Sequence, residues 1–390
     1  MTGIRLLEGI RVVSLEQYIS GPYCTAILAD AGADVIKVER PGEGDPRRWY
    51  DPKRGADDDF LSGGFASYNR GKKSVCLDLG EEPDNRAFGE LLATADVLVS
   101  NLRPGALARN GWPVERLHAD FPALVVCEIS GFGASGGPYA AWPAFDSVIQ
   151  AMSGLGSLLG ESPMAPPGLA PMGTMDMLSG IWAALGVLTA LVGRNKTGNG
   201  THVDTAMYDV GAALVGRPLA LYEFTGEVAQ RGADDFSPVG TFRAGDGGWV
   251  SIVIPTDEMW RRCCAVLGDR ELAVDPNLDT VLGRASRMKD VIVPRLEAWA
   301  QDMDRYQAAK MLRDGGQPAG VVQSIDEVRH CEQLRHRGLF AELDDERAVS
   351  DNGEPLRLAR TPLLFDGEGA TPGRVPALGQ HTQEILASLD

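Results

Sequence analysis

The fold is set by residues 10–39, where two strand patterns enclose one helical pattern. The first strand pattern is Ile10-Arg11-Val12-Val13-Ser14-Leu15, and the second is Asp34-Val35-Ile36-Lys37-Val38-Glu39. Between them, Gly21-Pro22 marks a turn and residues 24–30 have the pattern of a helix. This order predicts a β-α-β unit, the building block of a parallel sheet.

Further strand patterns continue the sheet along the chain. They fall at residues 74–78, 96–101 and 124–129, with helical patterns at 83–94 and 113–118. We therefore expect a doubly wound, mainly parallel α/β sheet with helices on both faces, a Rossmann-like large domain. Ligands of such sheets lie beyond the carboxyl ends of the strands. No G-x-G-x-x-G follows the first strand, so a nicotinamide dinucleotide is not expected.

The chain is expected to divide into three parts. Residues 1–225 form the large domain, and residues 226–325 form a smaller α/β domain with a strand at 249–254. Residues 326–390 return to the large domain. The segment at 202–208 is compatible with either a short strand or the start of a helix.

Composition excludes several classes of protein. The 390 residues carry a formal charge of −17, which argues against binding to nucleic acid or to anionic membranes. The N-terminus lacks a signal-peptide pattern and the longest uncharged apolar run is too short for a membrane span, so a cytoplasmic protein is expected. Six cysteines without a C-x-x-C pair and five histidines without metal spacing indicate no metal site.

A second stretch, Pro171-Met172-Gly173-Thr174-Met175-Asp176, leads one carboxylate onto a long apolar run. Residues 177–192 carry no charge and predict a buried helix that is apolar all round. Thr174 and Asp176 are residue types that cap helices, and the helix dipole favours an ionised carboxylate there. Asp176 is therefore either a structural cap or a nucleophile, and poor solvation of a charged carboxylate favours the nucleophile.

The balance of charge reverses between Arg40 and Lys73. This segment holds eight basic residues against six acids in a chain that is otherwise acidic. It is either a solvated surface loop or a strip suited to a ligand with several phosphates.

Several blocks together resemble the class III CoA-transferases, a group that includes formyl-CoA transferase, carnitine CoA-transferase and the related 2-methylacyl-CoA racemases. The blocks lie at residues 7–13, 29–45, 69–74, 101–105, 130–133, 137–139 and 197–200, in the order of the family. The resemblance implies an interlocked homodimer in which each chain threads through a ring made by the other.

The resemblance also implies a mechanism and its residues. Asp176 would attack the thioester of an acyl-CoA to give an anhydride, then carry CoA as an aspartyl thioester until a small carboxylic acid accepts it. Gln17 would lie near the reacting carbonyl. No cofactor beyond CoA itself, and no metal, is implied. The residues implied for CoA binding are Tyr18, Arg40, Lys72, Asn101, Leu102, Arg109, Tyr139 and Asp146.

Two alternatives remain open at this point. A racemase of the same superfamily needs an acid/base group on each face of the substrate, and where those racemases carry a His this chain has Phe145, which favours transfer. A CoA-binding protein without activity is the second alternative.

Residues 245–248 are a poor copy of the glycine run in oxalate-using members, so another acid is expected, with succinyl-CoA or a similar thioester as donor.

Overall fold

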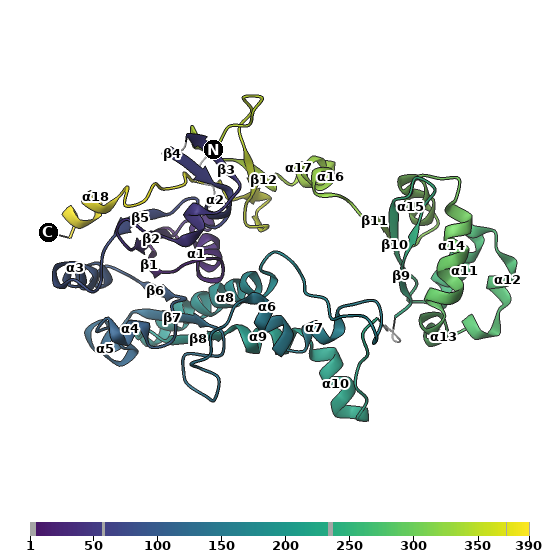
Figure 1. Cartoon of the computed structure of the whole chain (residues 1–390), viewed down its shortest axis with the longest axis horizontal. Helices are drawn as coiled ribbons and strands as arrows, with labels where there is room; N and C mark the ends of the chain where they lie inside the picture. Colours follow the sequence, from purple (N-terminus) through teal and green to yellow (C-terminus); the bar gives the residue numbers. More distant parts are fainter. Residues whose placement is uncertain (1–4, 57–58, 233–236, 372, 390) are drawn as a thin grey trace. The chain divides into compact units, whose positions relative to one another are not determined.

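The computed structural model describes residues 5–56, 59–232, 237–371 and 373–389. It divides into two compact units (Figure 1). The first unit is Met1–Arg231 with Glu332–Asp390, and the second is Gly232–Cys331. Sequence patterns had suggested divisions after residues 225 and 325.

A six-stranded parallel sheet forms the centre of the first unit, with the strand order β5-β2-β1-β6-β7-β8. The strands are β1 (Arg11–Leu15), β2 (Asp34–Glu39), β5 (Lys73–Cys76), β6 (Val97–Ser100), β7 (Val125–Ser130) and β8 (His202–Ala206). The segment at 202–208 is therefore a strand that runs directly into helix α9 (Met207–Leu214). The expected doubly wound parallel sheet is confirmed.

Alternating strand residues build two cores, one on each face of the sheet. Val13 and Ile36 pack with α3 (Glu82–Ala93), α5 (Val114–Asp120) and α18 (Thr382–Ala387), whereas Val12 and Val35 pack with α1 (Ser20–Asp30) and α8 (Thr174–Thr197). This alternation follows from the two-residue period of a strand, which sends neighbouring side chains to opposite faces.

Helix α8 departs from the sequence expectation of a helix buried all round. Its small residues face α1, and Gly180 lies so close that an added Cβ would be 2.7 Å from the Ser20 carbonyl oxygen. On its other side, Ile181, Trp182, Leu185 and Val192 are about half exposed. Among the described residues, α8 alone has the length and composition of a membrane span, but it packs as a core helix does, against α1 and the sheet.

The order of the strands places a crevice between β1 and β6. The chain runs outward from β1 to β2 and β5, then returns to β6 on the other side of β1. The loops that leave the carboxyl ends of β1 and β6 therefore diverge, and ligands of doubly wound sheets bind at this switch point. Gln17 follows β1 there, and Asn101 follows β6.

Shorter elements surround the sheet of the first unit. They are the 3₁₀ helix η1 (Pro46–Trp49), β3 (Lys53–Ala56), β4 (Asp59–Ser62), α2 (Gly63–Asn69), α4 (Ala106–Arg109), α6 (Asp146–Met152), α7 (Leu155–Leu158), α10 (Gly216–Thr225), α17 (Glu332–His336), β12 (Phe340–Glu342), β13 (Arg357–Ala359), β14 (Leu364–Phe365) and β15 (Glu368–Gly369).

The second unit has its own antiparallel sheet, with the order β11-β10-β9. Its elements are β9 (Val239–Arg243), β10 (Trp249–Val253), α11 (Asp257–Leu267), α12 (Arg270–Val274), η2 (Pro276–Leu278), α13 (Val281–Ser286), η3 (Met288–Ile292), α14 (Val293–Ala300), α15 (Arg305–Asp314), β11 (Ala319–Val321) and α16 (Ile325–His330). The helices α11, α14 and α15 cover a core around Phe242 and Ile252. The expected smaller α/β part is thus present.

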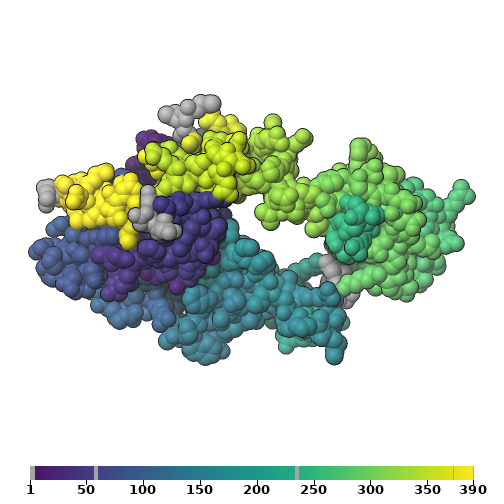
Figure 2. All heavy atoms as spheres, turned by 45° about the horizontal axis from the view of Figure 1, so that its top comes forward, coloured from purple at the N-terminus to yellow at the C-terminus, as the bar shows by residue number. Residues whose placement is uncertain are grey.

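The C-terminal segment, yellow in Figure 2, lies against the N-terminal part of the first unit, and its helix α18 contacts β5, the edge strand of the large sheet. At β5, the backbone amide of Ser74 donates to Nδ1 of His381 at 3.1 Å, and the amide of His381 donates to the Ser74 carbonyl at 2.9 Å. The hydroxyl of Thr382 accepts a further bond from the Cys76 amide at 3.0 Å. These contacts cover β5 with residues more than 300 positions away along the chain.

Candidate active site

Two adjoining cavities open at the carboxyl ends of β1 and β6. The larger, of ≈ 630 Å³, is lined by Asp176. The smaller, of ≈ 350 Å³, is lined by Arg40. Gln17 and Leu102 line both cavities, so these two residues form their common boundary.

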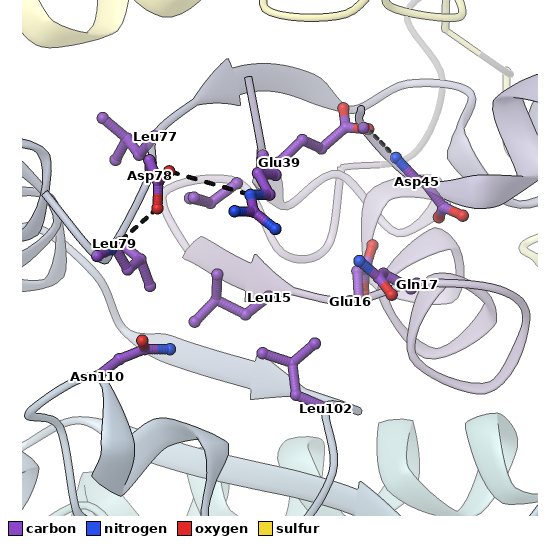
Figure 3. Close-up of a pocket in the computed structure, with 14 residues that line it drawn as sticks. Leu15, Glu16, Gln17, Glu39, Asp45, Leu77, Asp78, Leu79, Leu102 and Asn110 are labelled. Atoms are coloured by element: carbon purple, nitrogen blue, oxygen red, sulfur yellow. Dashed lines mark hydrogen bonds and ion pairs between the residues drawn. The ribbon is translucent and has the colours of Figure 1, made fainter. Parts of the chain in front are cut away.

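The smaller cavity is lined by both charged and apolar side chains (Figure 3). Glu16 and Gln17 lie at one end of it, and Asp78 and Leu79 lie at the other. The Arg40 side chain is 61% exposed, with ion-pair distances of 3.6 Å to Glu43 and 3.9 Å to Asp78. Such long, exposed pairs hold a guanidinium weakly, so Arg40 remains available to an anionic ligand.

Asn101 fixes the loop that follows β1. Its Oδ1 accepts from the backbone amide of Gln17 at 2.8 Å, and its Nδ2 donates to the Gln17 carbonyl at 2.8 Å and to the hydroxyl of Ser20 at 3.1 Å. The amide group is thus used within the protein. Asn101 also lines the larger cavity, but it shapes the site mainly by holding Gln17.

Asp176 is the third residue of α8. The residue before the helix is Gly173 in a left-handed conformation, with φ of 66°. A Cβ at Gly173 would lie 2.8 Å from Cδ1 of Ile19, so both the conformation and the packing require glycine. Thr174 does not cap the helix, because its hydroxyl donates to the Pro171 carbonyl at 2.7 Å.

The capping carboxylate of α8 comes from Asp146 on α6. Its Oδ1 accepts from the amide of Met175 at 2.5 Å and from that of Asp176 at 3.3 Å. Its Oδ2 accepts from Nε2 of Gln150 at 2.5 Å. Asp146 lines the larger cavity, but its carboxylate is occupied by these donors, and its expected role in CoA binding stays a prediction. It therefore acts on the site by holding the start of α8.

The same arrangement alters the acidity of Asp176. Burial raises the pKa of Asp176 to about 7, the nearby Asp146 carboxylate adds to the rise, and Arg47 opposes it. Sequence reasoning expected the helix terminus to keep this carboxylate ionised. The loss of solvation and the like charge outweigh the helix dipole, so Asp176 titrates near neutral pH.

Tyr18 forms part of the wall of the larger cavity in an unusual backbone conformation, with φ of 64°. Its backbone amide donates to Oδ1 of Asp45 at 3.2 Å, and its ring contacts Phe145 edge to face at 5.7 Å. Burial, followed by the neighbouring Tyr50, raises the pKa of Tyr18. Phe145 lines the cavity with a hydrocarbon ring that cannot transfer a proton.

Lys72 lies in neither cavity, contrary to the role in phosphate binding implied by the resemblance. Its enclosed ammonium donates to Oε1 of Glu16 at 2.7 Å and to two further protein oxygens. Burial lowers the pKa of Lys72 to about 8. Lys37, equally buried, bonds Oδ2 of Asp45 and the Glu16 carbonyl, both at 2.9 Å. These buried ion pairs support the loop that carries Gln17.

Two other candidates lie at the margin of the site. Arg109 ends α4 with an exposed side chain and lines neither of the two cavities. Tyr139 packs against Trp142, with ring centroids 4.3 Å apart, and only Trp142 reaches the larger cavity.

Arg47 is a site residue that sequence reasoning did not single out. It follows Asp45, whose Oδ1 accepts from the Arg47 amide at 2.9 Å, and its side chain lines the larger cavity together with Asp176. The basic segment between Arg40 and Lys73 was the available signal. Charge alone could not show which of its members would remain unpaired.

Metal ligands do not gather within the described ranges, where no group of three or more His, Cys, Asp or Glu residues has a suitable arrangement. All six cysteines are free. The absence of a metal from the reaction stays a prediction.

Comparison with known proteins identifies the class of this chain. The model of CoA-transferase family III matches residues 7–382. The chain therefore belongs to CoA-transferase family III, and the class of enzyme expected from the sequence is confirmed.

Individual relatives span nearly the whole chain. A succinyl-CoA:mesaconate CoA-transferase of Haloarcula hispanica is 33% identical over 97% of this chain and 95% of its own length. An acetyl-CoA:oxalate CoA-transferase of Acetobacter aceti is 32% identical over 90% of this chain and 89% of its own length. The crystal structure of a CAIB/BAIF family protein from Brucella suis has 31% identity and a TM-score of 0.86, with both chains covered completely.

Proposed function

We propose that this enzyme moves CoA from an acyl-CoA donor to a small carboxylic acid, with Asp176 as its covalent nucleophile. The observation that carries the proposal is the environment of Asp176, a poorly solvated carboxyl group that lines the larger cavity. The second cavity joins the first at Gln17 and Leu102, which suits a ligand with a polar nucleotide end and a reactive thioester end. Family membership supports the same chemistry.

The reaction would proceed through four nucleophilic steps at carbonyl carbons. The carboxylate of Asp176 attacks the donor thioester, which forms an acyl-aspartyl anhydride and expels CoA thiolate. The thiolate attacks the aspartyl carbonyl, which releases the donor acid and leaves an aspartyl-CoA thioester. The acceptor carboxylate attacks that thioester, and the thiolate then attacks the acceptor carbonyl to give the new acyl-CoA and free Asp176. Each step exchanges a carboxylate and a thiolate at a carbonyl carbon without changing an oxidation state, so the reaction needs no redox group.

The pKa of Asp176 fits the role of nucleophile. A carboxylate that is more basic than usual is a stronger nucleophile once ionised, and a pKa of about 7 keeps a large fraction ionised at neutral pH. Arg40 is available to a phosphate in the smaller cavity, and Leu79 and Leu102 offer apolar surface to an adenine ring. Gln17 would contact the ligand where the two cavities meet.

Trapping of the covalent intermediate tests this proposal. The protein is incubated with acetyl-, butyryl-, succinyl- and a 2-methylacyl-CoA, quenched with hydroxylamine, digested and analysed by mass spectrometry. A hydroxamate on the Asp176 peptide is expected in the parent and in Asp314→Ala, a matched change of an exposed acid in the second unit. It should be absent from Asp176→Ala.

Two results would contradict the proposal. CoA transfer that persists in Asp176→Ala would exclude the covalent route. Exchange of solvent deuterium into the 2-methylacyl-CoA, without any CoA transfer, would instead indicate a racemase. Another group would then transfer the proton that a His transfers in racemases at the position of Phe145.

We also propose that the active form is a homodimer, interlocked as the family resemblance implies. The support is the half-exposed apolar face of α8 at Ile181, Trp182 and Leu185, together with Phe224 on α10, which is 90% exposed. Apolar patches of this kind are usually covered by another protein surface. Sedimentation should give twice the chain mass of 41.7 kDa. A monomer at micromolar concentration would contradict the proposal.

A further inference from the structure

We propose that Gln150 is a positioning residue for the nucleophile, because its side-chain amide holds Asp146 and Ala170 and, through them, the place and the charged surroundings of Asp176. The inference rests on the proposed function, since it assigns a further residue to the same reaction. Gln150 lines neither of the two cavities, so it acts through its neighbours and not on a ligand.

Gln150 is fully buried on α6, where the polar atoms of its amide need partners within the protein. Its Nε2 donates to Oδ2 of Asp146 at 2.5 Å and to the Ala170 carbonyl at 2.8 Å. Its Oε1 accepts from the Ala170 amide at 2.7 Å. The NH₂ group thus faces two acceptors and the carbonyl oxygen faces a donor, a combination that glutamine provides and an ionised glutamate does not.

The first of these contacts reaches the start of α8 through Asp146. Helices α6 and α8 pack against each other (Figure 1). Asp146 uses Oδ1 for the amides of Met175 and Asp176, and it uses Oδ2 for Gln150. Because both oxygens have donors, the carboxylate is held in one orientation beside Asp176. Without Gln150, Oδ2 would lose its donor and the carboxylate would be free to turn away from the helix.

The second contact holds the segment that leads into α8. Residues 159–173 form no helix or strand, and Leu169 and Met172 are 49% and 82% exposed. Gln150 binds both backbone polar groups of Ala170 within this exposed segment, as a neighbouring strand would. Ala170 lies shortly before the first residue of α8, so the contact fixes the direction from which the chain enters the helix.

Gln150 therefore acts on the charge near Asp176 as well as on its place. Charged and titratable groups face Asp176 from several elements: Asp146 on α6, Arg47 on η1 and Tyr68 on α2, with Tyr18, Tyr50 and Arg103 in the wall of the same cavity. Burial raises the pKa of Asp176, Asp146 adds to the rise and Arg47 opposes it. Loss of Gln150 would release the negative neighbour and leave the positive one in place.

The dependence of adduct formation on pH tests the inference. The rate at which Asp176 forms its trapped adduct is measured by rapid quench between pH 5 and 9 in the parent and in Gln150→Met, which has a similar volume but no donor. The plateau rate is expected to fall about 100-fold, because the nucleophile is less well placed. The midpoint is expected to move about one unit to lower pH, because a like charge has left.

The isosteric variant Gln150→Glu separates the donor from the shape of the side chain. Only its protonated form can donate to Asp146 or to Ala170, so its rate relative to the parent should fall as pH rises. It also tests the inference if Gln150→Met does not fold. Gln383→Glu, the same change at an exposed position on α18, is the matched control and should follow the parent at every pH.

A stability measurement separates this inference from the proposed function, because it needs no activity. Urea unfolding gives the advantage of Asp176→Asn over Asp176 at each pH, both in the parent and in Gln150→Met. This advantage should stop growing at a lower pH in the Gln150→Met background, since Asp176 then ionises more readily. An absent adduct in the parent would overturn the proposed function and leave this result to decide the role of Gln150.

Three results would overturn the role of Gln150. The first is an unmoved midpoint in Gln150→Met, whether or not the plateau falls, because a loss of folded protein lowers a rate without moving its midpoint. The second is a Gln150→Glu rate that follows the parent at every pH. The third is an advantage of Asp176→Asn that levels off at the same pH in both backgrounds.

Discussion

Replacement of Asp176 by Asn should abolish CoA transfer and at the same time stabilise the folded chain. The ionised carboxylate is held in an unfavourable place, because burial and Asp146 raise its pKa to about 7 from an ordinary value of 3.8. At 1.36 kcal/mol for each unit of pKa, this difference corresponds to ~4 kcal/mol of free energy. An amide of the same shape avoids that cost.

The sign of the effect depends on pH. The unfolded chain releases the proton of Asp176 near pH 3.8, whereas the folded chain keeps it until about pH 7. Between these values the folded state binds more protons, so the free energy of unfolding of the parent falls as pH rises. The advantage of Asp176→Asn over the parent should therefore be absent below pH 4 and reach ~4 kcal/mol above pH 7.

Urea denaturation of the parent and of Asp176→Asn at several pH values between 4 and 8 measures this difference. Asp314→Asn, an exposed change on α15 in the second unit, is the matched control and should show no such pH-dependent gain. A stability difference between parent and Asp176→Asn that does not change with pH would refute the reasoning. The reasoning would also be refuted if the free energy of unfolding of Asp176→Asn fell relative to that of the parent as pH rises.

Three further predictions concern the same region. The rate of adduct formation at Asp176, followed by rapid quench and mass spectrometry, should rise with pH through about 7, because the ionised form attacks; a flat profile would count against Asp176 as the nucleophile. Asp146→Asn keeps an acceptor for the α8 amides but removes the like charge, so it should move the midpoint of that profile to lower pH, and an unmoved midpoint would show that burial alone sets it. Lys37→Met leaves Asp45 and Glu16 with too little positive charge in a buried network and should cost ~3–5 kcal/mol in thermal unfolding; a change below 1 kcal/mol would mean that water reaches these groups.

Much of the fold could be predicted because its signals are local. The strand at Asp34–Glu39 was expected with its observed bounds, because a mainly apolar run lies between turn residues. In the structure all of its residues but the first are buried, so both faces of the strand are covered. Helix α8 was expected as a helix, but not its half-exposed side. An apolar sequence predicts that the surface of a helix will be buried, but it does not show whether the residues that bury it belong to the same chain or to another.

The site could be predicted only where residue type and position in the strand order were sufficient. Gln17 and Leu102 line both cavities at the switch point, because they follow the adjacent strands β1 and β6, and Asp176 lines the larger cavity from the start of α8. Lys72 and Arg47 could not be told apart by sequence, since both are basic residues in one segment. Glu16, whose carboxylate pairs with the Lys72 ammonium, lies 56 positions before it in the sequence, and only the folded chain brings the two together.

The position of the last helix has a consequence for how the chain acquires its structure during synthesis. The backbone of β5 at Ser74 is completed by His381, 307 residues later, so the large sheet cannot protect that edge until residue 381 has been synthesised. The second unit lies wholly between these two residues in the sequence and contains its own hydrophobic core. It can therefore fold before the segment with His381 has been synthesised and has joined the first unit. A ribosome that stops before residue 381 would therefore release a chain whose second unit is folded and whose first unit has an open edge strand.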